Sequence, residues 1–344
     1  MMISVILLTA CVFCGTIGVS IWEVGDFRGR VPELNASLIT PRTFFDVQHK
    51  LPFVARKYHK SLDEIASASG FTGDSLDWLA KTIGETARIS SLEGELQETR
   101  LAPVIHNIKW KYFFEKFRDL DIYAVTEAPQ AVREHLRLFP FFSCGGNSYK
   151  LQAPYMWVSG GLKESRSVIH ADSHHNQHCV LKGTKRFMII PSSVPVDTEA
   201  YGWLYTQRED GTPVEGFEDS YGDYAANIDV SNVDLNRYPA WKTIPWYLAE
   251  LHAGDCLYMP IEWYHYVESE AEPTVTWHIW FHLMAQWVDD CPAEAQPEPL
   301  SLDQCVFKKP KNVTQHQWGP FSDRASLCRP SYFDPPVGTC IRSR

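Results

Sequence analysis

Residues 155–191, YMWVSGGLKESRSVIHADSHHNQHCVLKGTKRFMIIP, decide the fold class of this chain. Short runs rich in Val, Ile and aromatic residues are separated by breaks containing Gly, Asn or Asp, and the same texture returns in residues 255–284. Short strands at this spacing are typical of an all-β sandwich or barrel. The chain has 344 residues, which leaves room for a mainly β core flanked by an N-terminal region and a tail.

Two short motifs in these runs carry ligands for a metal. In His170-Ala171-Asp172 the imidazole and the carboxylate are two positions apart, and such residues face the same side of a strand. The second motif, AGDCLYMPIEWYH at residues 253–265, ends on His265. Two imidazoles and one carboxylate form the facial triad of non-haem Fe(II) oxygenases. Taken singly, each residue also fits a plain role, either a buried His–Asp hydrogen bond or a core histidine.

A lysine near the first motif suggests a use for the open positions of such an iron. Lys185 follows Gly183 and Thr184 and opens the run KRFMII, so its side chain can reach into a barrel and pair with a carboxylate. A 2-oxoglutarate molecule would chelate the iron through its 1-carboxylate and 2-oxo group, with its distal carboxylate on Lys185. Ser167 would add a hydroxyl donor. The alternative is an exposed lysine whose stem covers apolar surface.

These residues resemble the JmjC-domain, cupin-like Fe(II)/2-oxoglutarate oxygenases. The resemblance extends over roughly residues 40–285, and its specific motifs are residues 157–191 and GDCLYMPIEWYHYVES at residues 254–269. It implies a double-stranded β-helix, the jelly-roll or cupin core. It also implies that His170, Asp172 and His265 are the catalytic iron ligands, and that Lys185 anchors 2-oxoglutarate.

The resemblance also implies a set of cosubstrate-binding residues. Ser167 stands where the family often has Thr, Asn176 matches a frequent active-site Asn, and His278 falls where many members carry an Asn that contacts the cosubstrate. Tyr155 and Trp157 precede the His170 motif and are expected to line the same pocket, with core packing as their alternative. The His-x-Asp form, in place of His-x-Glu, resembles the hydroxylases of the family more than its histone demethylases.

Further histidines and tryptophans surround these motifs. We expect His174, His175 and His178 to lie at the rim of the site or behind its ligands, since no Glu beside His174 completes the H-E-x-x-H zinc pattern. Trp263, Tyr264, Trp277 and Trp280 are interpreted as core packing.

The predicted function is therefore an Fe(II)- and 2-oxoglutarate-dependent dioxygenase that uses molecular oxygen and hydroxylates a protein or peptide. Its 32 Lys and Arg against 42 Asp and Glu give a net charge of −10, which argues against a phosphate-backbone binder, so no nucleic-acid partner is expected. Three alternatives remain open: a catalytically silent lumenal cupin-like binding or folding protein, a zinc hydrolase, and a protein demethylase.

The first 22 residues contain no charged side chain and predict a signal peptide or a membrane-anchoring helix. Either one directs the chain to the secretory pathway, as a protein of the endoplasmic reticulum lumen or a secreted one, and the second would also attach it to the membrane. Asn35-Ala-Ser37 and Asn312-Val-Thr314 are acceptors for N-glycosylation, which makes the chain a candidate glycoprotein.

The cysteines agree with an oxidising compartment. Four of them (Cys291, Cys305, Cys328, Cys340) crowd the Pro-rich tail, where we expect disulfides among them in one of three pairings. Cys179 and Cys256 lie in apolar runs and are interpreted as small buried hydrophobic residues. The sequence assigns no role to Cys144.

Helical signals concentrate before residue 140. Residues 74–85 predict a helix with an acidic cap, and residues 44–69 show helical spacing that Pro52 interrupts. The chain is thus expected to divide into the following parts: a signal peptide or anchor (1–22), an N-terminal helical or mixed region supporting the barrel (23–139), the JmjC/cupin catalytic core with an insertion at about 196–245 (140–288), and a Pro- and Cys-containing tail (289–344).

Overall fold

The computed structural model describes most of the chain between residue 19 and residue 307. The described ranges are 19–84, 88–89, 91–94, 108–116, 122–161, 164–167, 169–194, 203–204, 224–226, 228–291, 300–302, 305–307 and 338–340.

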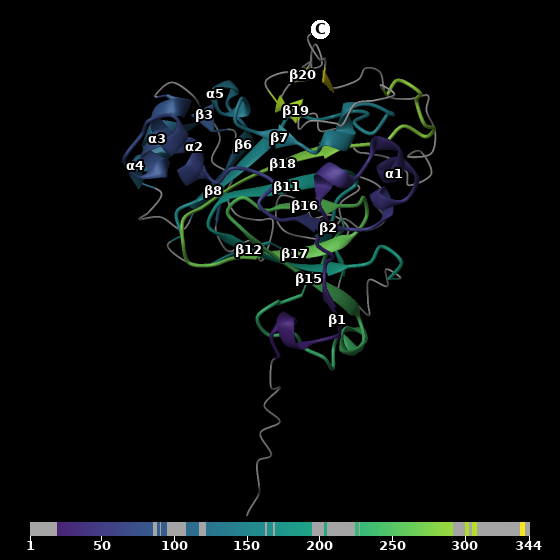
Figure 1. Ribbon diagram of the computed structural model, residues 1–344. Coiled ribbons are helices and arrows are strands. Elements are labelled where there is room, and N and C mark those ends of the chain that lie inside the picture. The colour runs from purple at the N-terminus through teal and green to yellow at the C-terminus, as the bar shows by residue number, and fades with distance from the viewer. Residues whose placement is uncertain are drawn as a thin grey trace, which may run out of the picture.

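Two β-sheets lie face to face and form the core (Figure 1). The first, called the His170 sheet below, has eight strands, ordered β1 (Asp26–Arg30), β15 (Pro245–His252), β12 (Thr184–Ile190), β17 (Tyr264–Ser269), β10 (His170–Ala171), β14 (Tyr224–Ala226) and β13 (Trp203–Leu204), with β9 (Ser165–Arg166) also pairing with β17. The second, called the pocket sheet, has seven strands, ordered β2 (Phe53–Ala55), β16 (Cys256–Met259), β11 (His175–Lys182), β18 (Thr274–Phe281), β8 (Tyr155–Ser159), β6 (Ile122–Glu127) and β4 (Ser91–Gly94).

This architecture confirms the predicted mainly β class with a jelly-roll core. Alternation along the strands explains the layering, because successive side chains point to opposite faces. Along β11, for example, His178 points between the sheets, where its ring lies 5.2 Å from that of Phe187 on β12. Its neighbour Cys179 points outward into a different core. Inward apolar residues of both sheets, such as Ile189 and Leu257, form the core between them.

Helices cover the outer face of the pocket sheet (Figure 1). They are α1 (Pro41–Asp46), α2 (Leu62–Ala68), α3 (Ser75–Ile83), α4 (Trp110–Lys116) and α5 (Gln130–Arg133), with short 3-10 turns η1 (Ile21–Glu23), η2 (Ala36–Leu38), η3 (Gln48–Lys50), η5 (Pro140–Ser143) and η6 (Pro239–Lys242). Three small two-stranded sheets complete the fold: β3 (Arg88–Ile89) with β5 (Ile108–Lys109), β7 (Arg137–Leu138) with β19 (Leu300–Ser301), and β20 (Cys305–Phe307) with β21 (Gly338–Cys340).

The N-terminal region is more mixed than its helical signals indicate. Helix α3 is confirmed, and the Asp74 side chain accepts from the Leu76 N–H at its start. The helical spacing over 44–69 is broken further than Pro52 alone requires, because Phe53–Ala55 pairs with β16 as an edge strand. Strands β1, β2, β4 and β6 all belong to the two main sheets, so this region forms part of the barrel as well as supporting it.

The outer face of the His170 sheet is covered by two segments from distant parts of the sequence. Residues 228–244 follow β14 and pack Trp241 against this face, so the predicted insertion both extends the sheet and covers it. Residues 19–24 lie on the same face, where Ile21 is buried and its N–H donates to Val230 O. Residues 19–22, which the sequence analysis counts with the leader, are therefore part of the folded body.

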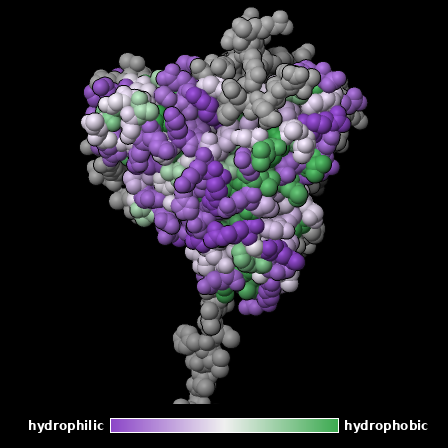
Figure 2. All heavy atoms as spheres, in the orientation of Figure 1, coloured by the Kyte–Doolittle hydropathy of each residue, from purple (hydrophilic) through white to green (hydrophobic). Residues whose placement is uncertain are grey.

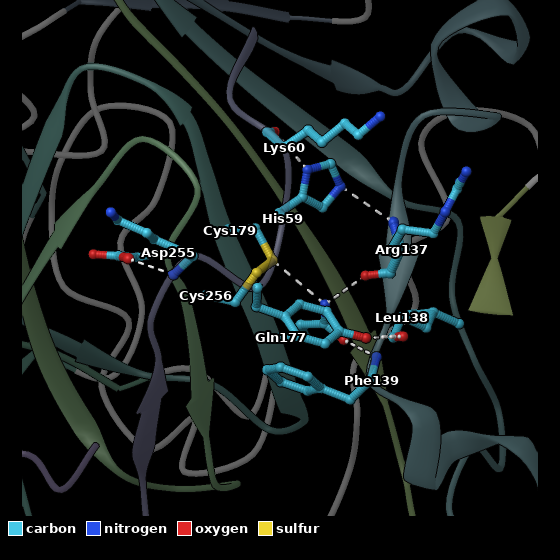
Figure 3. Close-up of a disulfide and its surroundings, with 11 residues drawn as sticks. His59, Lys60, Arg137, Leu138, Phe139, Gln177, Cys179, Asp255 and Cys256 are labelled. Atoms are coloured by element: carbon cyan, nitrogen blue, oxygen red, sulfur yellow. Dashed lines mark hydrogen bonds between the residues drawn. A yellow bond between two sulfur atoms is a disulfide. The ribbon is translucent and has the colours of Figure 1, made fainter. Parts of the chain in front are cut away.

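A disulfide joins the register partners Cys179 and Cys256 across β11 and β16 (Figure 3). Both residues are fully buried, as expected, but their interpretation as unpaired small hydrophobic residues is wrong. Their Cα atoms lie 4.1 Å apart because the two strands place them directly opposite each other. Next to them, the Gln177 amide donates to Arg137 O at 2.9 Å and accepts from the Phe139 N–H at 3.0 Å, which fixes the segment before η5 to β11.

A second disulfide joins Cys144 to Cys291 over 147 residues. The prediction that tail cysteines pair only among themselves is therefore wrong for Cys291, since its partner lies just after η5. Of the other tail cysteines, Cys305 and Cys340 are register partners in the β20–β21 pair, and Cys328 lies outside the described residues.

The start of the tail is anchored. Leu302 is fully buried in the core under the helices, and its N–H donates to Leu136 O.

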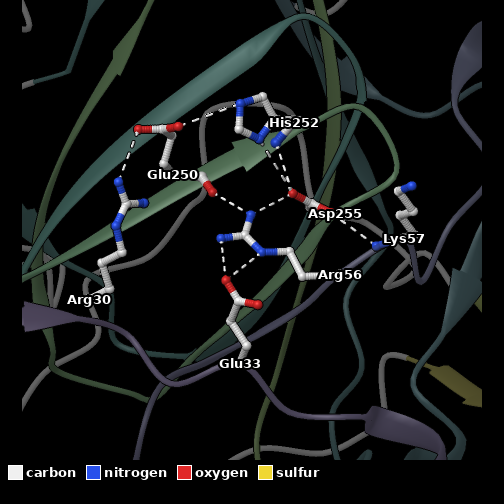
Figure 4. Close-up of polar contacts among 7 residues, drawn as sticks. All are labelled: Arg30, Glu33, Arg56, Lys57, Glu250, His252 and Asp255. Atoms are coloured by element: carbon white, nitrogen blue, oxygen red, sulfur yellow. Dashed lines mark hydrogen bonds and ion pairs between the residues drawn. The ribbon is translucent and has the colours of Figure 1, made fainter.

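An ion-pair network ties the N-terminal region to the turn between β15 and β16 (Figure 4). The Arg56 guanidinium pairs with Glu33 and with the buried Asp255, both at 2.7 Å, and donates to Glu250 O. The Asp255 carboxylate also accepts from the Lys57 N–H at 3.0 Å. Arg56 therefore holds three chain segments together at this edge of the barrel.

The surface shown in Figure 2 is mainly hydrophilic, with hydrophobic side chains gathered just below α1. Exposed apolar residues in this part of the chain include Leu38, Val47 and Leu51. Within the described ranges, no helix has both the length and the apolar character needed to cross a bilayer. Residues 1–18, which hold most of the predicted signal peptide or anchor, lie outside those ranges.

Candidate active site

The candidate active site lies where β10 and β17 run side by side. His170 on β10 and His265 on β17 are register partners, and their rings lie 4.2 Å apart. Asp172 follows β10 directly, and its backbone carbonyl accepts from the Glu262 N–H in the loop that leads into β17. The strand before this loop, β16, begins after a tight turn at Gly254, where φ is +97° and an added Cβ would approach His59 O to 3.0 Å.

The three side chains converge on one point. One ligand atom from each of His170, Asp172 and His265 lies within 4.8 Å of the others. The two histidine Nε2 atoms are each 3.9 Å from a different Asp172 carboxylate oxygen. This separation is too long for a hydrogen bond but leaves room for an ion bound to all three.

Neighbouring groups orient these ligands. The Asp172 Oδ2 atom accepts from the Trp280 indole N–H at 3.0 Å and has a long contact of 3.5 Å to the Asn176 amide nitrogen. The His265 Nδ1 atom lies 3.1 Å from Trp263 O, so a proton on Nδ1 donates to that carbonyl and leaves the Nε2 lone pair for a metal. Burial opposes ionisation of Asp172, but the imidazoles of His265 and His170 still hold its pKa below the usual value.

Lys185 points between the sheets from the second position of β12. It is buried, so the alternative of an exposed strand-end lysine is excluded. Burial lowers the pKa of its ammonium group to about 8. Among the described residues no carboxylate pairs with it, and its Nζ lies 5.9 Å from the centre of the Trp157 ring. A buried cation without a counter-ion calls for an anionic ligand.

The pocket sheet faces Lys185 with a group of buried polar atoms. These atoms lie on the inner side of β8, β11 and β18 and have no hydrogen-bond partner among the described residues: Ser159 Oγ, Asn176 Oδ1, His178 Nε2, Thr276 Oγ1 and His278 Nε2. A buried polar atom without a partner costs about 1–3 kcal/mol, so a cluster of them along one face indicates a polar ligand between the sheets.

We call the interior between Lys185 and these polar atoms the pocket. The predicted cosubstrate residues differ in how deeply they lie at it. Asn176 and His278 are buried on its wall. Tyr155 is only half-buried, at the end of β8, with its ring 6.0 Å from both His278 and Trp280. The Ser167 hydroxyl oxygen accepts from the Val267 N–H at 2.9 Å, which leaves its proton able to donate.

The remaining histidines differ in position. His174 lies beside His282 with rings 4.4 Å apart, and burial lowers its pKa to about 4. The His175 ring stacks on that of Phe281 on the outer side of the pocket sheet. His178 instead faces the pocket opposite His278, and burial, followed by the charge of Lys185, lowers its pKa well below the usual value. It therefore lies on the pocket wall and not at the rim, because β11 carries it between the sheets.

The sequence did not predict two hydrogen bonds made by tryptophan side chains at this site, although Trp157 was expected to line the pocket. Trp280 was interpreted as core packing, but it is only half-buried, and its indole N–H donates to the Asp172 carboxylate. Trp157 donates its indole N–H to His278 Nδ1 at 2.9 Å. Trp280 lies two residues after His278 on β18, so the alternation of side chains along a strand indicates that both face inward. The Trp157 contact depends instead on the register between β8 and β18.

Comparisons with known proteins agree with this geometry. The family model for a cupin-like domain matches residues 58–286. The chain is 33% identical to Jumonji C domain-containing protein 5 from Drosophila melanogaster over 115 residues, which are 33% of this chain and 24% of that protein.

It is 30% identical to lysine-specific demethylase JMJ31 from Arabidopsis thaliana over 127 residues, 36% of this chain and 20% of that protein. It is 26% identical to human bifunctional peptidase and (3S)-lysyl hydroxylase JMJD7 over 133 residues, 37% of this chain and 42% of that protein. The matched part of this chain thus spans less than half the length of each of these relatives.

Proposed function

This chain belongs to the JmjC, cupin-like family of oxygenases, and on that premise we propose that it is an Fe(II)- and 2-oxoglutarate-dependent dioxygenase that hydroxylates a protein or peptide in the secretory pathway. The observation that carries the proposal is that a candidate metal site and a buried lysine lie together between the two main sheets. His170, Asp172 and His265 converge in the same interior as Lys185, since the charges of Lys185 and His265 both act on His178, and among the described residues no carboxylate pairs with Lys185.

The residues present fit both groups. Two imidazoles and one carboxylate suit a ferrous ion and leave it open positions. A ferrous ion, one carboxylate and the Lys185 ammonium sum to two positive charges, which a dianion such as 2-oxoglutarate neutralises. Because burial lowers the pKa values of His178 and His278, the two imidazoles on the pocket wall stay neutral and offer hydrogen bonds rather than charge.

Iron and 2-oxoglutarate, when bound, would supply the oxidising chemistry: one atom of molecular oxygen enters a substrate C–H bond to give a hydroxyl group, and the other enters the succinate that forms as 2-oxoglutarate loses carbon dioxide. The chain's own residues supply the positions. His170, Asp172 and His265 hold the metal, and Trp280 keeps the Asp172 carboxylate oriented toward it. Lys185 binds the distal carboxylate, and the apolar core between the sheets limits the entry of water.

The ligands also differ in exposure, which marks the side where substrate enters. The His170 side chain is 20% exposed, whereas those of Asp172 and His265 are 9% and 6% exposed. A large substrate can reach only an open side, so a protein or peptide approaches the metal past His170. The donor set also suits Zn(II) in a hydrolase, but that alternative leaves Lys185 and the polar pocket wall without a role.

Two observations support a secretory location. The Cys179–Cys256 and Cys144–Cys291 disulfides are of the kind that form in an oxidising compartment. The Asn35 acceptor for N-glycosylation lies exposed at the surface just before η2.

The decisive test of the activity removes single ligands. We expect His170→Ala and Asp172→Ala to lose iron binding and substrate-dependent release of succinate. His252→Ala is the matched control, since His252 is an exposed histidine on β15 outside the site. Unchanged succinate release in either ligand variant would refute the assignment.

The substrate is sought by mass spectrometry of secreted proteins from cells with and without this gene. The proposal predicts peptides that carry one additional oxygen atom only when the gene is present. Loss of methyl groups in place of oxygen gain indicates a demethylase, and the absence of any 2-oxoglutarate consumption by iron-loaded protein indicates a binding protein.

A further inference from the structure

A single hydrogen bond fixes how the His278 imidazole is protonated. The Trp157 indole nitrogen lies 2.9 Å from His278 Nδ1. An indole N–H can only donate, so His278 Nδ1 must accept and therefore carries no proton. The proton of a neutral His278 ring is then on Nε2, on the opposite edge of the ring.

The Nε2 edge faces the pocket without a protein partner. His278 is 3% exposed, and its Nε2 atom has no hydrogen-bond partner among the described residues. Burial lowers the pKa of the ring to about 3, so the ring is neutral at ordinary pH and has one N–H donor only. A buried donor with no partner is costly, and a ligand oxygen is the natural acceptor.

The position of His278 places this donor between the metal ligands and the buried cation. On the pocket sheet, the Asn176–Trp280 register pair contacts Asp172, and the His178–His278 pair is the next inward-facing pair along the same strands. Lys185 lies across from this layer on β12, where its charge acts on both His178 and His278. A dianionic 2-oxo acid that reaches from the metal to Lys185 passes this layer.

We propose that Trp157 is a positioning residue, whose indole N–H locks His278 in the Nε2–H tautomer and so presents a fixed N–H donor to the bound 2-oxo acid, an inference that rests on the proposed function. Without this lock the imidazole would exchange between two tautomers. The form without a proton on Nε2 would turn a lone pair toward an anionic oxygen, which weakens binding.

The same reasoning explains why tryptophan accompanies histidine here. His278 stands where many members of the family that this sequence resembles carry an asparagine. An asparagine amide keeps its two N–H donors whatever surrounds it, whereas a histidine supplies a donor at Nε2 only if something fixes its tautomer. Trp157 does this from β8, because Trp157 and His278 project from the same inner face of adjacent strands.

The first experiment reads the tautomer directly. In full-length, Zn(II)-loaded protein with ¹⁵N-labelled histidine, we expect the wild-type His278 signals of a single tautomer with its proton on Nε2. Trp157→Phe keeps a ring but removes the N–H, and we expect its His278 signals to shift toward a mixture. A wild-type ring protonated on Nδ1, or a Trp157→Phe ring that remains wholly the Nε2–H tautomer, would overturn the proposal.

The second experiment measures the affinity for 2-oxoglutarate by calorimetry with the same metal-loaded proteins. Loss of one fixed hydrogen bond predicts that Trp157→Phe binds 2-oxoglutarate about three- to tenfold more weakly, with metal affinity unchanged. The matched background is His278→Asn, in which the donor needs no lock. There Trp157→Phe should change affinity by less than about twofold, because the role of Trp157 depends on the histidine.

The outcomes distinguish failure of the tautomer lock from failure of the proposed oxygenase function. Failure of wild-type protein to bind 2-oxoglutarate would refute the oxygenase assignment itself. Wild-type binding, together with equal losses from Trp157→Phe in the wild-type and His278→Asn backgrounds, would refute only the tautomer lock, because it would show that Trp157 acts independently of the imidazole.

Discussion

Lys185 shows how burial gives one side chain a specific task. An exposed lysine keeps its charge to about pH 10, whereas burial lowers the pKa of Lys185 to about 8. In the ligand-free protein the ammonium form is therefore present below about pH 8 and is lost above it. A dianionic ligand binds the charged form, so ligand affinity and the ionisation of this side chain are linked.

This linkage predicts a pH-dependent affinity for 2-oxoglutarate. Since the ammonium is lost as pH rises through the pKa, affinity should be highest below about pH 8 and fall by up to about tenfold per pH unit above it. The measurement is a calorimetric titration of metal-loaded protein across this range. Lys185→Arg keeps its charge, so its decline should be absent, and Lys185→Met should bind weakly at every pH. The same steep decline in both variants would assign the pH effect to another group.

At the scale of secondary-structure elements, the two faces of β11 make different contacts, and one of these joins it to β16. The inner face of β11 presents Asn176 and His178 to the pocket, and its outer face carries Cys179, which is bonded to β16 under the helices. The chain continues from β16 through Pro260 to β17 and His265. The disulfide (Figure 3) thus joins β11, which carries Asn176 and His178, to β16, the strand that precedes the proposed metal ligand His265.

Removing this disulfide should destabilise the protein strongly. The bond closes a loop with a sequence separation of 77 residues, for which the chain-entropy estimate is about 4 kcal/mol. We expect Cys179→Ala, Cys256→Ala and the double variant to lower the unfolding free energy by similar amounts, because each one breaks the same bond. Chemical denaturation measures these values. Single-variant losses that add up in the double variant would show that packing, and not the cross-link, is responsible.

The Arg56 network joins elements rather than strands of one sheet (Figure 4). Arg56→Ala leaves the buried Asp255 carboxylate without its guanidinium, and we expect a loss of about 2–3 kcal/mol in the unfolding free energy. Arg30→Ala is the matched control: Arg30 is 58% exposed and pairs with Glu250 at 3.8 Å, so its loss should cost less than about 1 kcal/mol. Equal losses in the two variants, again by chemical denaturation, would contradict a special role for Arg56.

At the scale of the whole molecule, segments that are far apart in the sequence cover the outer faces of the two main sheets. Residues 19–24 and 228–244 cover one outer face, and the helices with Leu302 cover the other. The Trp22 indole N–H donates to the Glu268 carboxylate on β17. The Arg186 guanidinium lies over the Trp22 ring in a cation–π contact, with its carbon 4.4 Å from the ring centre. Any processing of the N-terminus that preserves this packing must therefore cut before Val19.

The proposed secretory route predicts N-glycosylation at Asn35. The residue is exposed, so the enzyme that attaches the glycan can reach it. We expect protein expressed in its own cells to gain mobility on glycosidase treatment, and Asn35→Gln to lose part or all of that shift. Asn35→Gln combined with Asn312→Gln should abolish the shift. Protein that glycosidase leaves unaltered and that protease digests in intact microsomes would contradict the lumenal location.

The sequence by itself predicted the mainly β fold class and the three side chains that the structure brings together, His170, Asp172 and His265. The short runs of Val, Ile and aromatic residues and the two-residue spacing of His170 and Asp172 are local properties of the sequence. Local spacing sets which side chains share a face of a strand. Lys185 is a partial case: its place at the start of an apolar run allowed an inward direction, and only the structure excluded the exposed alternative.

Only the tertiary structure decided which distant residues meet. Cys179 with Cys256, Cys144 with Cys291, Trp280 with Asp172, and Trp157 with His278 are all contacts between segments far apart in the chain. Each depends on the order and register of strands, and a register shift of one residue would turn every side chain to the opposite face. Pairing of this kind comes from the packing of the whole barrel, so no short stretch of sequence contains it.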